Sequence, residues 1–128
     1  YLILEKFIQM QVVNINDKLS QIKEYWNPAI AGELNGQHIK LVKFKGTFVW
    51  HKHDDEDEMF YVLKGSFNME LRDKKVTLHE HEFFIVPRGV EHRPEAEEEV
   101  AVMLFEPAGT INTGNTVNAF TKMELQKI

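Results

Sequence analysis

The sequence contains no cysteine, which excludes disulfides, thiolate metal sites, iron–sulfur clusters and thiol nucleophiles. Any metal site must therefore be built from imidazole and carboxylate side chains. Basic residues are in the minority, with 15 Lys and Arg against 20 Asp and Glu, and they are scattered along the chain. Because nucleic-acid binding needs a clustered basic surface, we do not expect a nucleic-acid partner.

The sequence also lacks an apolar run long enough to cross a membrane. Residues 1–9 are apolar but include Glu5 and Lys6, and no small-residue cleavage signal follows them. Two interpretations fit this segment: sequence upstream of a natural start at Met10, or an ordinary N-terminal strand. Under both interpretations we expect no membrane partner and a cytoplasmic location.

What the sequence does contain is the composition of an ordinary globular protein. Its 128 residues are 43% hydrophobic and include nine Phe, two Trp and three Tyr. This length suits one domain with one hydrophobic core. No internal repeat, low-complexity tract or linker divides the chain. We therefore expect a single domain over residues 1–128, with its core in residues 30–110.

Apolar residues near the N-terminus recur at helical spacing and predict a short helix within residues 14–25. Asn16 or Asp17 is the candidate N-cap, and Pro28 ends the segment. Beyond Pro28 the apolar period changes to two, which is typical of strands.

Short strand patterns then follow one another to residue 105. The first two, at 30–34 and 38–45, flank Asn35-Gly36, a signature of a two-residue hairpin turn. Further strands are expected at residues 47–51, 58–63, 66–71, 75–78, 82–86, 92–94 and 100–105. Many short strands at this spacing predict an all-β sandwich or barrel.

Two of these strands, 58–63 and 100–105, are apolar on both faces. A strand with one face in solvent normally alternates apolar with polar residues. The second face must therefore be covered, either by the N-terminal segment or by a second subunit. We favour a homodimer.

Potential metal ligands are densest just before the strand at 58–63. His51 and His53 lie two residues apart in a predicted strand, so they project from the same face and can chelate an ion. Glu58 shares its facing with the apolar inner residues of its strand, and the turn at 87–89 delivers His92 to the start of another. Three imidazoles and one carboxylate leave coordination positions open on a divalent ion, as a reactive or ligand-binding metal requires. This donor set suits Fe, Mn, Zn, Ni and Cu alike.

Two motifs connect these residues to a known family. Residues 51–65 read H-x-H-x4-E-x6-G, and residues 87–92 read P-x-G-x2-H. Together they resemble the two signature motifs of the cupin superfamily, in particular small single-domain cupins, some of which are labelled mannose-6-phosphate isomerase-like. The resemblance covers about residues 40–110, and residues 106–114 are similar to the end of the barrel in some small cupins.

The resemblance implies a double-stranded β-helix, or jelly roll, with its metal ligands at His51, His53, Glu58 and His92. Three positions depart from the family pattern. The glycine that usually opens the first motif lies one residue closer, at Gly46, while His81 and Ala96 replace a glycine and an asparagine of the second motif. These are turn and support positions, so we expect them to affect loop shape more than metal binding.

Other polar residues have plainer interpretations. The acids at 54–57 lack the spacing of a calcium loop and are expected to be solvated. His79 and His81 form a second H-x-H, but they lie in a predicted turn with no third imidazole nearby. We expect both at the surface.

Three residues are candidates for binding a substrate. Arg88 is either a surface ion-pair residue or a group at the barrel mouth that recognises a carboxylate or phosphate. Phe48 and Met69 either line a pocket or belong to the plain barrel core.

Three functional hypotheses remain open. The first is a metal-dependent enzyme, an isomerase or oxygenase, that acts on a small polar molecule such as a sugar or a keto or carboxylic acid. The second is a module that binds or senses a small ligand without turnover, and the third is a structural domain stiffened by its metal. Because enzyme and binder share the same ligand residues, the sequence does not separate them.

Overall fold

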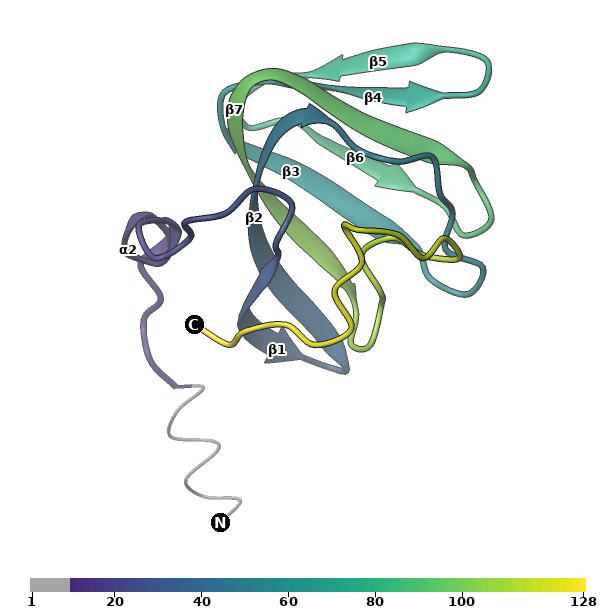
Figure 1. The fold of residues 1–128 in the computed structure, drawn as a ribbon. Helices are drawn as coiled ribbons and strands as arrows, with labels where there is room; N and C mark the ends of the chain where they lie inside the picture. The colour runs from purple at the N-terminus through teal and green to yellow at the C-terminus, as the bar shows by residue number, and fades with distance from the viewer. Residues whose placement is uncertain (1–9) are drawn as a thin grey trace.

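The computed structural model describes residues 10–128 and is dominated by antiparallel strands (Figure 1). Residues 1–9, for which two interpretations were open, lie outside the described part. The described elements are one helix and seven strands: α2 (Ile15–Leu19), β1 (Ala29–Leu34), β2 (Gln37–Thr47), β3 (Glu58–Lys64), β4 (Phe67–Leu71), β5 (Lys75–Leu78), β6 (Phe83–Val86) and β7 (His92–Pro107). The all-β class predicted from the strand spacing is confirmed.

The long strand β7 connects the two parts of the sheet. The strand order is β1-β2-β7-β3-β6, and β4 pairs with β5 and also with β7. The first residues of β7 pair with β4, as in Leu71↔His92, whereas its later residues pair with β3, as in Tyr61↔Met103. In Figure 1, β7 curves from the β4–β5 hairpin down to β2 and β3. One strand therefore carries side chains into both ends of the barrel.

The core follows from the period of two along these strands. Val42 of β2, Val62 of β3 and Val102 of β7 are fully buried and lie at one level of the sheet, because Val102 pairs with both of the others. Phe60 and Glu58 share the inward face of β3 with Val62. Burial of such apolar side chains is the main favourable term in folding. It also fixes which way each strand faces.

The N-terminal helix is shorter than predicted. The expected helix over 14–25 was wrong in its extent and cap, because Asn14 is the N-cap, its side chain accepting from the Asp17 N–H at 3.0 Å, and α2 ends at Leu19. Tertiary packing explains the difference. Ile22 is buried in a cluster with Ala29 and Leu41, and Trp26 reaches the main core with a φ of 59°. The chain must leave the helix to place these side chains.

Two strand predictions were also wrong. Residues 48–50 form no strand, and His51 makes only an isolated bridge to His92. Strand β2 continues through a bulge between Phe44 and Gly46 and ends at Thr47, which still pairs with Glu95 of β7. Strands predicted separately at 92–94 and 100–105 are one continuous strand, β7, of 16 residues. The acidic run Glu97–Glu99 stays extended there because β7 passes from β4 to β3 at this point and these side chains remain exposed.

The outer face of the sheet is covered on one side only. Leu19 and Ile22 from the N-terminal segment pack with Leu41 and Met103, so this segment covers the β2 side. On the β6 side, Phe83 and Ile85 are 59% and 52% exposed. Strands β3 and β7, which are apolar on both faces, therefore lie next to an apolar surface that no described residue covers. No described helix has the length and apolar character needed to span a membrane.

Candidate metal centre

The four predicted ligands come from three segments that meet at one end of the barrel. His51 and His53 lie in the loop between β2 and β3, Glu58 opens β3, and His92 opens β7. Two backbone hydrogen bonds join the first and last of these segments: His51 N–H donates to His92 O at 3.1 Å, and His92 N–H donates to His51 O at 2.9 Å. The backbone therefore holds two imidazoles side by side.

The structure brings all four side chains together in the interior. One ligand atom from each of His51, His53, Glu58 and His92 lies within 4.8 Å of the other three, and all four residues are buried. Glu58 Oε1 is 3.2 Å from His53 Nε2 and 3.4 Å from His92 Nε2. Within residues 10–128 this is the cluster of metal-type donors that the structure assembles.

Backbone carbonyls orient two of the rings. His51 Nδ1 donates to Val49 O at 2.9 Å, and His92 Nδ1 donates to Val90 O at 2.9 Å. In a neutral imidazole this assigns the proton to Nδ1 and leaves the Nε2 lone pair free. Such a hydrogen bond behind a histidine ligand is the usual way in which its tautomer and direction are set.

The polar atoms that face one another in this cluster have no hydrogen-bond partner among the described residues. They are His53 Nε2, His92 Nε2 and Glu58 Oε1. A buried polar atom without a partner costs about 1–3 kcal/mol. One ion placed among these atoms would satisfy all three, and imidazole with carboxylate is a donor set suited to transition metals. The residues present therefore fit a metal ion.

The electrostatics favour the protonation states that a metal requires. Burial, together with the neighbouring His92, lowers the pKa of His51 to about 4. Burial alone would raise the pKa of Glu58, but the adjacent imidazoles of His53 and His92 outweigh this and hold that pKa below its usual value. At neutral pH His51 is neutral and Glu58 is charged, as ligands must be.

A buried ion pair missed in the sequence analysis lies near Glu58. Lys40 Nζ is 3.6 Å from Glu106 Oε1 and donates to Thr110 O at 3.2 Å. Burial raises the pKa of Glu106 well above its usual value, and the charge of Glu58 raises it further. The two-residue period of a strand could have revealed Glu106 in the sequence. It lies four residues after the buried Val102 in the same strand, so both side chains face inward.

The C-terminal segment also reaches the loop that contains His51 and His53, a contact that no local pattern in the sequence indicates. Asn115 N–H donates to Lys52 O at 3.1 Å, and Lys52 N–H donates to the Asn115 side-chain oxygen at 3.2 Å. These bonds bracket the residue between His51 and His53. In Figure 1 the yellow C-terminal chain passes beside the loop between β2 and β3. We call residues 108–121 the strap.

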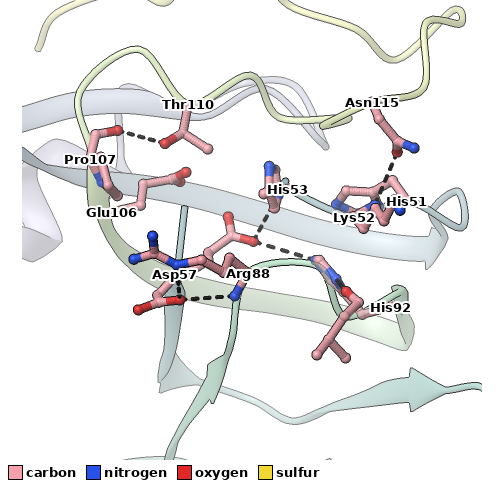
Figure 2. A network of polar contacts seen from close by, with 12 residues as sticks. His51, Lys52, His53, Asp57, Arg88, His92, Glu106, Pro107, Thr110 and Asn115 are labelled. Atoms are coloured by element: carbon pink, nitrogen blue, oxygen red, sulfur yellow. Dashed lines mark hydrogen bonds and ion pairs between the residues drawn. The ribbon is translucent and has the colours of Figure 1, made fainter. Parts of the chain in front are cut away.

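The predicted substrate-binding residues lie in three different places. Phe48 contacts the site, with its ring centroid 5.4 Å from that of His51 in an edge-on arrangement. Met69 is fully buried within the hydrophobic core. Arg88 is at the surface, its side chain 63% exposed, and its Nε donates to Asp57 Oδ1 at 3.3 Å (Figure 2).

The second H-x-H lies apart from the cluster. His79 and His81 are exposed in the turn before β6, and His81 Nδ1 is 3.0 Å from the Tyr61 hydroxyl. Among the acids at 54–57, Asp57 pairs with Arg88 and Asp54 with Lys52, both at exposed positions.

Comparison with known proteins supports the interpretation of the motifs. Residues 40–106 match the family model of the Cupin domain. A solved cupin-2 domain containing protein from Shewanella frigidimarina NCIMB 400 is 44% identical with a TM-score of 0.75, over 78% of this chain and 98% of that chain. The expected jelly roll is thereby confirmed as the fold.

Two curated relatives match in sequence. An uncharacterized protein, YdbB, of Bacillus subtilis (strain 168) is 32% identical over 75 residues, which are 58% of this chain and 66% of that protein. The 3-hydroxyanthranilate 3,4-dioxygenase of Xenopus tropicalis is 27% identical over 101 residues, which are 73% of this chain and 36% of that protein. The match thus spans just under two thirds of the first relative and about a third of the second.

Close packing of the strap on the loop that contains His51 and His53 can be tested at Gly114. A Cβ on Gly114 would lie 2.1 Å from Lys52 O and 3.3 Å from His53 Nδ1, whereas a Cβ on Gly109 would meet nothing within 4 Å. Both residues have positive φ. We expect Gly109→Ala to lower the free energy of unfolding by about 1 kcal/mol. We expect Gly114→Ala to lower it by on the order of 2–3 kcal/mol, because the strap must move as well. Urea unfolding measures both, and equal losses would show that the contact is absent.

The buried state of His51 predicts its titration. An NMR titration of the metal-free protein should place the midpoint near pH 4 instead of near pH 6.5. Between these values the unfolded chain binds a proton at His51 that the folded protein does not bind. Acidification through this range therefore removes up to on the order of 3 kcal/mol of stability. The loss is measured against His51→Gln, which lacks the titration; an identical pH dependence in both proteins would contradict the prediction.

Proposed function

This chain belongs to the cupin domain family, and on that premise we propose that it binds one divalent transition-metal ion through His51, His53, Glu58 and His92 and presents that ion to a small-molecule ligand. The observation that supports this most directly is the group of four buried donor atoms within 4.8 Å of one another. Three of these atoms have no other partner among the described residues. A purely structural polar cluster would instead be expected to satisfy its own hydrogen bonds.

The chain's own residues prepare the site for such an ion. The carbonyls of Val49 and Val90 orient the rings of His51 and His92, and burial keeps His51 neutral. When bound, the ion supplies Lewis acidity and, with iron, redox chemistry as well. The barrel wall limits the access of water, which strengthens every electrostatic interaction inside.

Within the enzyme hypothesis, an oxygenase has the better support. The 27% identity to 3-hydroxyanthranilate 3,4-dioxygenase covers 73% of this chain. A sugar isomerase, the other activity considered, has no comparable relative among those described above. A module that binds its ligand without turnover uses the same four residues. Measured oxygen consumption by the iron-loaded protein with candidate ligands separates that module from an oxygenase.

The metal proposal is tested by elemental analysis of protein purified without added metal. We expect roughly one equivalent of a transition metal, and near-complete loss in His51→Ala and His92→Ala, because each removes a ligand from a four-ligand site. His79→Ala and His81→Ala are the matched controls and should retain the metal, since both histidines are exposed in a turn. Protein that contains no metal in repeated preparations, and takes up none when a metal is added, would refute the proposal.

We also propose that the open half of the outer face is a homodimer contact. Cross-strand pairing places Ile85 beside Met59 and Phe83 beside Tyr61, which makes a continuous apolar surface on β3 and β6. Strand β6 ends the strand order, so its outer edge has no partner among the described strands. A second copy can cover both the face and the edge about a two-fold axis, as isologous dimers do.

Replacing one exposed apolar residue by a charge tests this contact. Ile85→Lys should shift the protein from dimer to monomer in sedimentation velocity, because it buries an unpaired ammonium group at the contact. Val117→Lys adds the same charge at another exposed apolar position, on the strap, and should leave the mass unchanged. A monomeric unmodified protein at micromolar concentration would rule the dimer out.

A further inference from the structure

Glu106 lies opposite the proposed carboxylate ligand on the inner face of the sheet. The pairing of β3 with β7 begins at Met59↔Phe105, so one further step in the same register sets Glu58 opposite Glu106. Residues directly opposite in an antiparallel pair have Cβ atoms about 4.5–5.5 Å apart, so their side chains can meet. Glu58 is 3% and Glu106 is 2% exposed. Two carboxyl groups therefore face each other in the interior of the barrel.

The contact between these two groups is close. Glu58 is within hydrogen-bonding reach of Glu106, and both this contact and the charge of Glu58 raise the pKa of Glu106. Glu58 Oε1 and Glu106 Oε2 are buried and have no hydrogen-bond partner among the described residues. Like charges directly opposite each other in a sheet are destabilising. The position of Glu106 therefore needs an explanation beyond ordinary packing.

Lys40 holds Glu106 from the other side. The Lys40 ammonium group is 3.6 Å from Glu106 Oε1 and donates to Thr110 O at 3.2 Å. Since Oε1 is engaged by Lys40, Oε2 is the oxygen left for Glu58. The Thr110 hydroxyl donates to Pro107 O at 2.7 Å and closes the turn that follows β7 (Figure 2). The Glu106 carboxyl group is thus fixed by residues outside the four-donor cluster.

Stability alone gives little reason for a buried ion pair at this place. Replacement of such a pair by well-packed apolar residues is often neutral or stabilising. A carboxylate that ligates a metal, in contrast, commonly needs a hydrogen bond from a further residue to set its orientation. His53 and His92, the imidazoles beside Glu58, belong to the donor cluster themselves. Glu106 is placed to supply that further hydrogen bond.

We propose that Glu106 is a positioning residue of the metal site, which hydrogen-bonds Glu58 and keeps its carboxylate directed at the neighbouring imidazoles. Lys40 holds Glu106 in place for this role. The inference rests on the proposed metal function, because Glu58 needs a fixed direction as a ligand. A hydrogen bond between two carboxyl groups needs one proton, whichever group holds it. An amide at position 106 supplies an N–H donor in the same place, so Glu106→Gln is the conservative variant.

Co²⁺ binding to the metal-free protein, measured by isothermal titration calorimetry, tests the proposal. Glu106→Ala should weaken binding on the order of 10–100-fold, as loss of a residue that orients a ligand does. Glu106→Gln should retain most of the affinity. Both variants remove the charge that faces Lys40, so the difference between them reports the hydrogen bond. Equal losses in the two variants, or no loss in Glu106→Ala, would overturn the proposal.

The matched control breaks a different ion pair of the same strand. Glu70 accepts from Arg93 of β7, with 2.6 Å between Glu70 Oε2 and the nearest guanidinium nitrogen. It is partly buried but lies outside the donor cluster. Glu70→Ala should therefore leave Co²⁺ affinity unchanged. A loss as large as that of Glu106→Ala would show that any broken ion pair on β7 weakens the site, and would contradict a specific role of Glu106.

The visible spectrum of bound Co²⁺ separates positioning from a general folding defect. At saturating Co²⁺, Glu106→Ala should change the position and intensity of the absorption bands, because Glu58 is no longer held in one direction. Glu106→Gln should reproduce the spectrum of the unmodified protein. If Glu106→Ala does not fold, Glu106→Leu fills a similar volume without a donor and takes its place. An unchanged spectrum in the variant without a donor would refute positioning.

Failure of this inference is distinguishable from failure of the proposed function. Loss of Co²⁺ binding in His51→Ala shows that the ion occupies the donor cluster. If the unmodified protein binds no Co²⁺, the metal proposal is overturned and this inference with it. If the unmodified protein binds Co²⁺ and Glu106→Ala binds it equally well, the metal proposal stands and the role of Glu106 alone is overturned.

Discussion

The pair of backbone hydrogen bonds between His51 and His92 is the contact on which the site depends. This pair joins the loop between β2 and β3, which has no regular strand pairing, to the first residue of β7, the longest described strand. The carbonyls of Val49 and Val90 then fix the two rings by the same hydrogen bond, each from two residues earlier in the chain. Glu58 completes the group because its side chain lies on the inward face of β3.

The interior therefore contains two environments in direct contact. One is a buried polar cluster, in which four donors lie beside the Lys40–Glu106 pair. The other is the main hydrophobic core, which includes Trp26, Phe44 and Phe48. Burial of unpaired polar groups costs stability unless something binds them. The first environment thus favours a bound ion, whereas the second is stabilised by the burial of its own hydrocarbon surface.

Local patterns predicted much of the fold. Alternation identified the β1–β2 hairpin at Asn35-Gly36, the facing of Glu58 with Phe60, and the positions of most strands. The patterns failed where tertiary packing overrides local preference. Burial of Ile22 and Trp26 ends the helix early. Of the strand expected at 47–51, only Thr47 lies in a strand, as the last residue of β2, and His51 makes an isolated bridge to His92. The break expected between the strands at 92–94 and 100–105 is absent. Exposed glutamates are compatible with an extended chain where β7 passes from β4 to β3.

The sequence by itself determined the chemical types of the four donors, their order, the inward facing of Glu58 and the position of His92 at the start of a strand. These follow from residue identity and from a two-residue period, which are local properties. Only the tertiary structure decided that Asn115 brackets Lys52, that Trp26 stacks on Phe48, and that Arg88 binds Asp57 at the surface. Each of these contacts joins segments far apart in the chain. Their geometry depends on how the whole barrel packs, and no local pattern encodes it. The donor set that could bind a metal was therefore readable in advance, whereas the long-range contacts that position it were not.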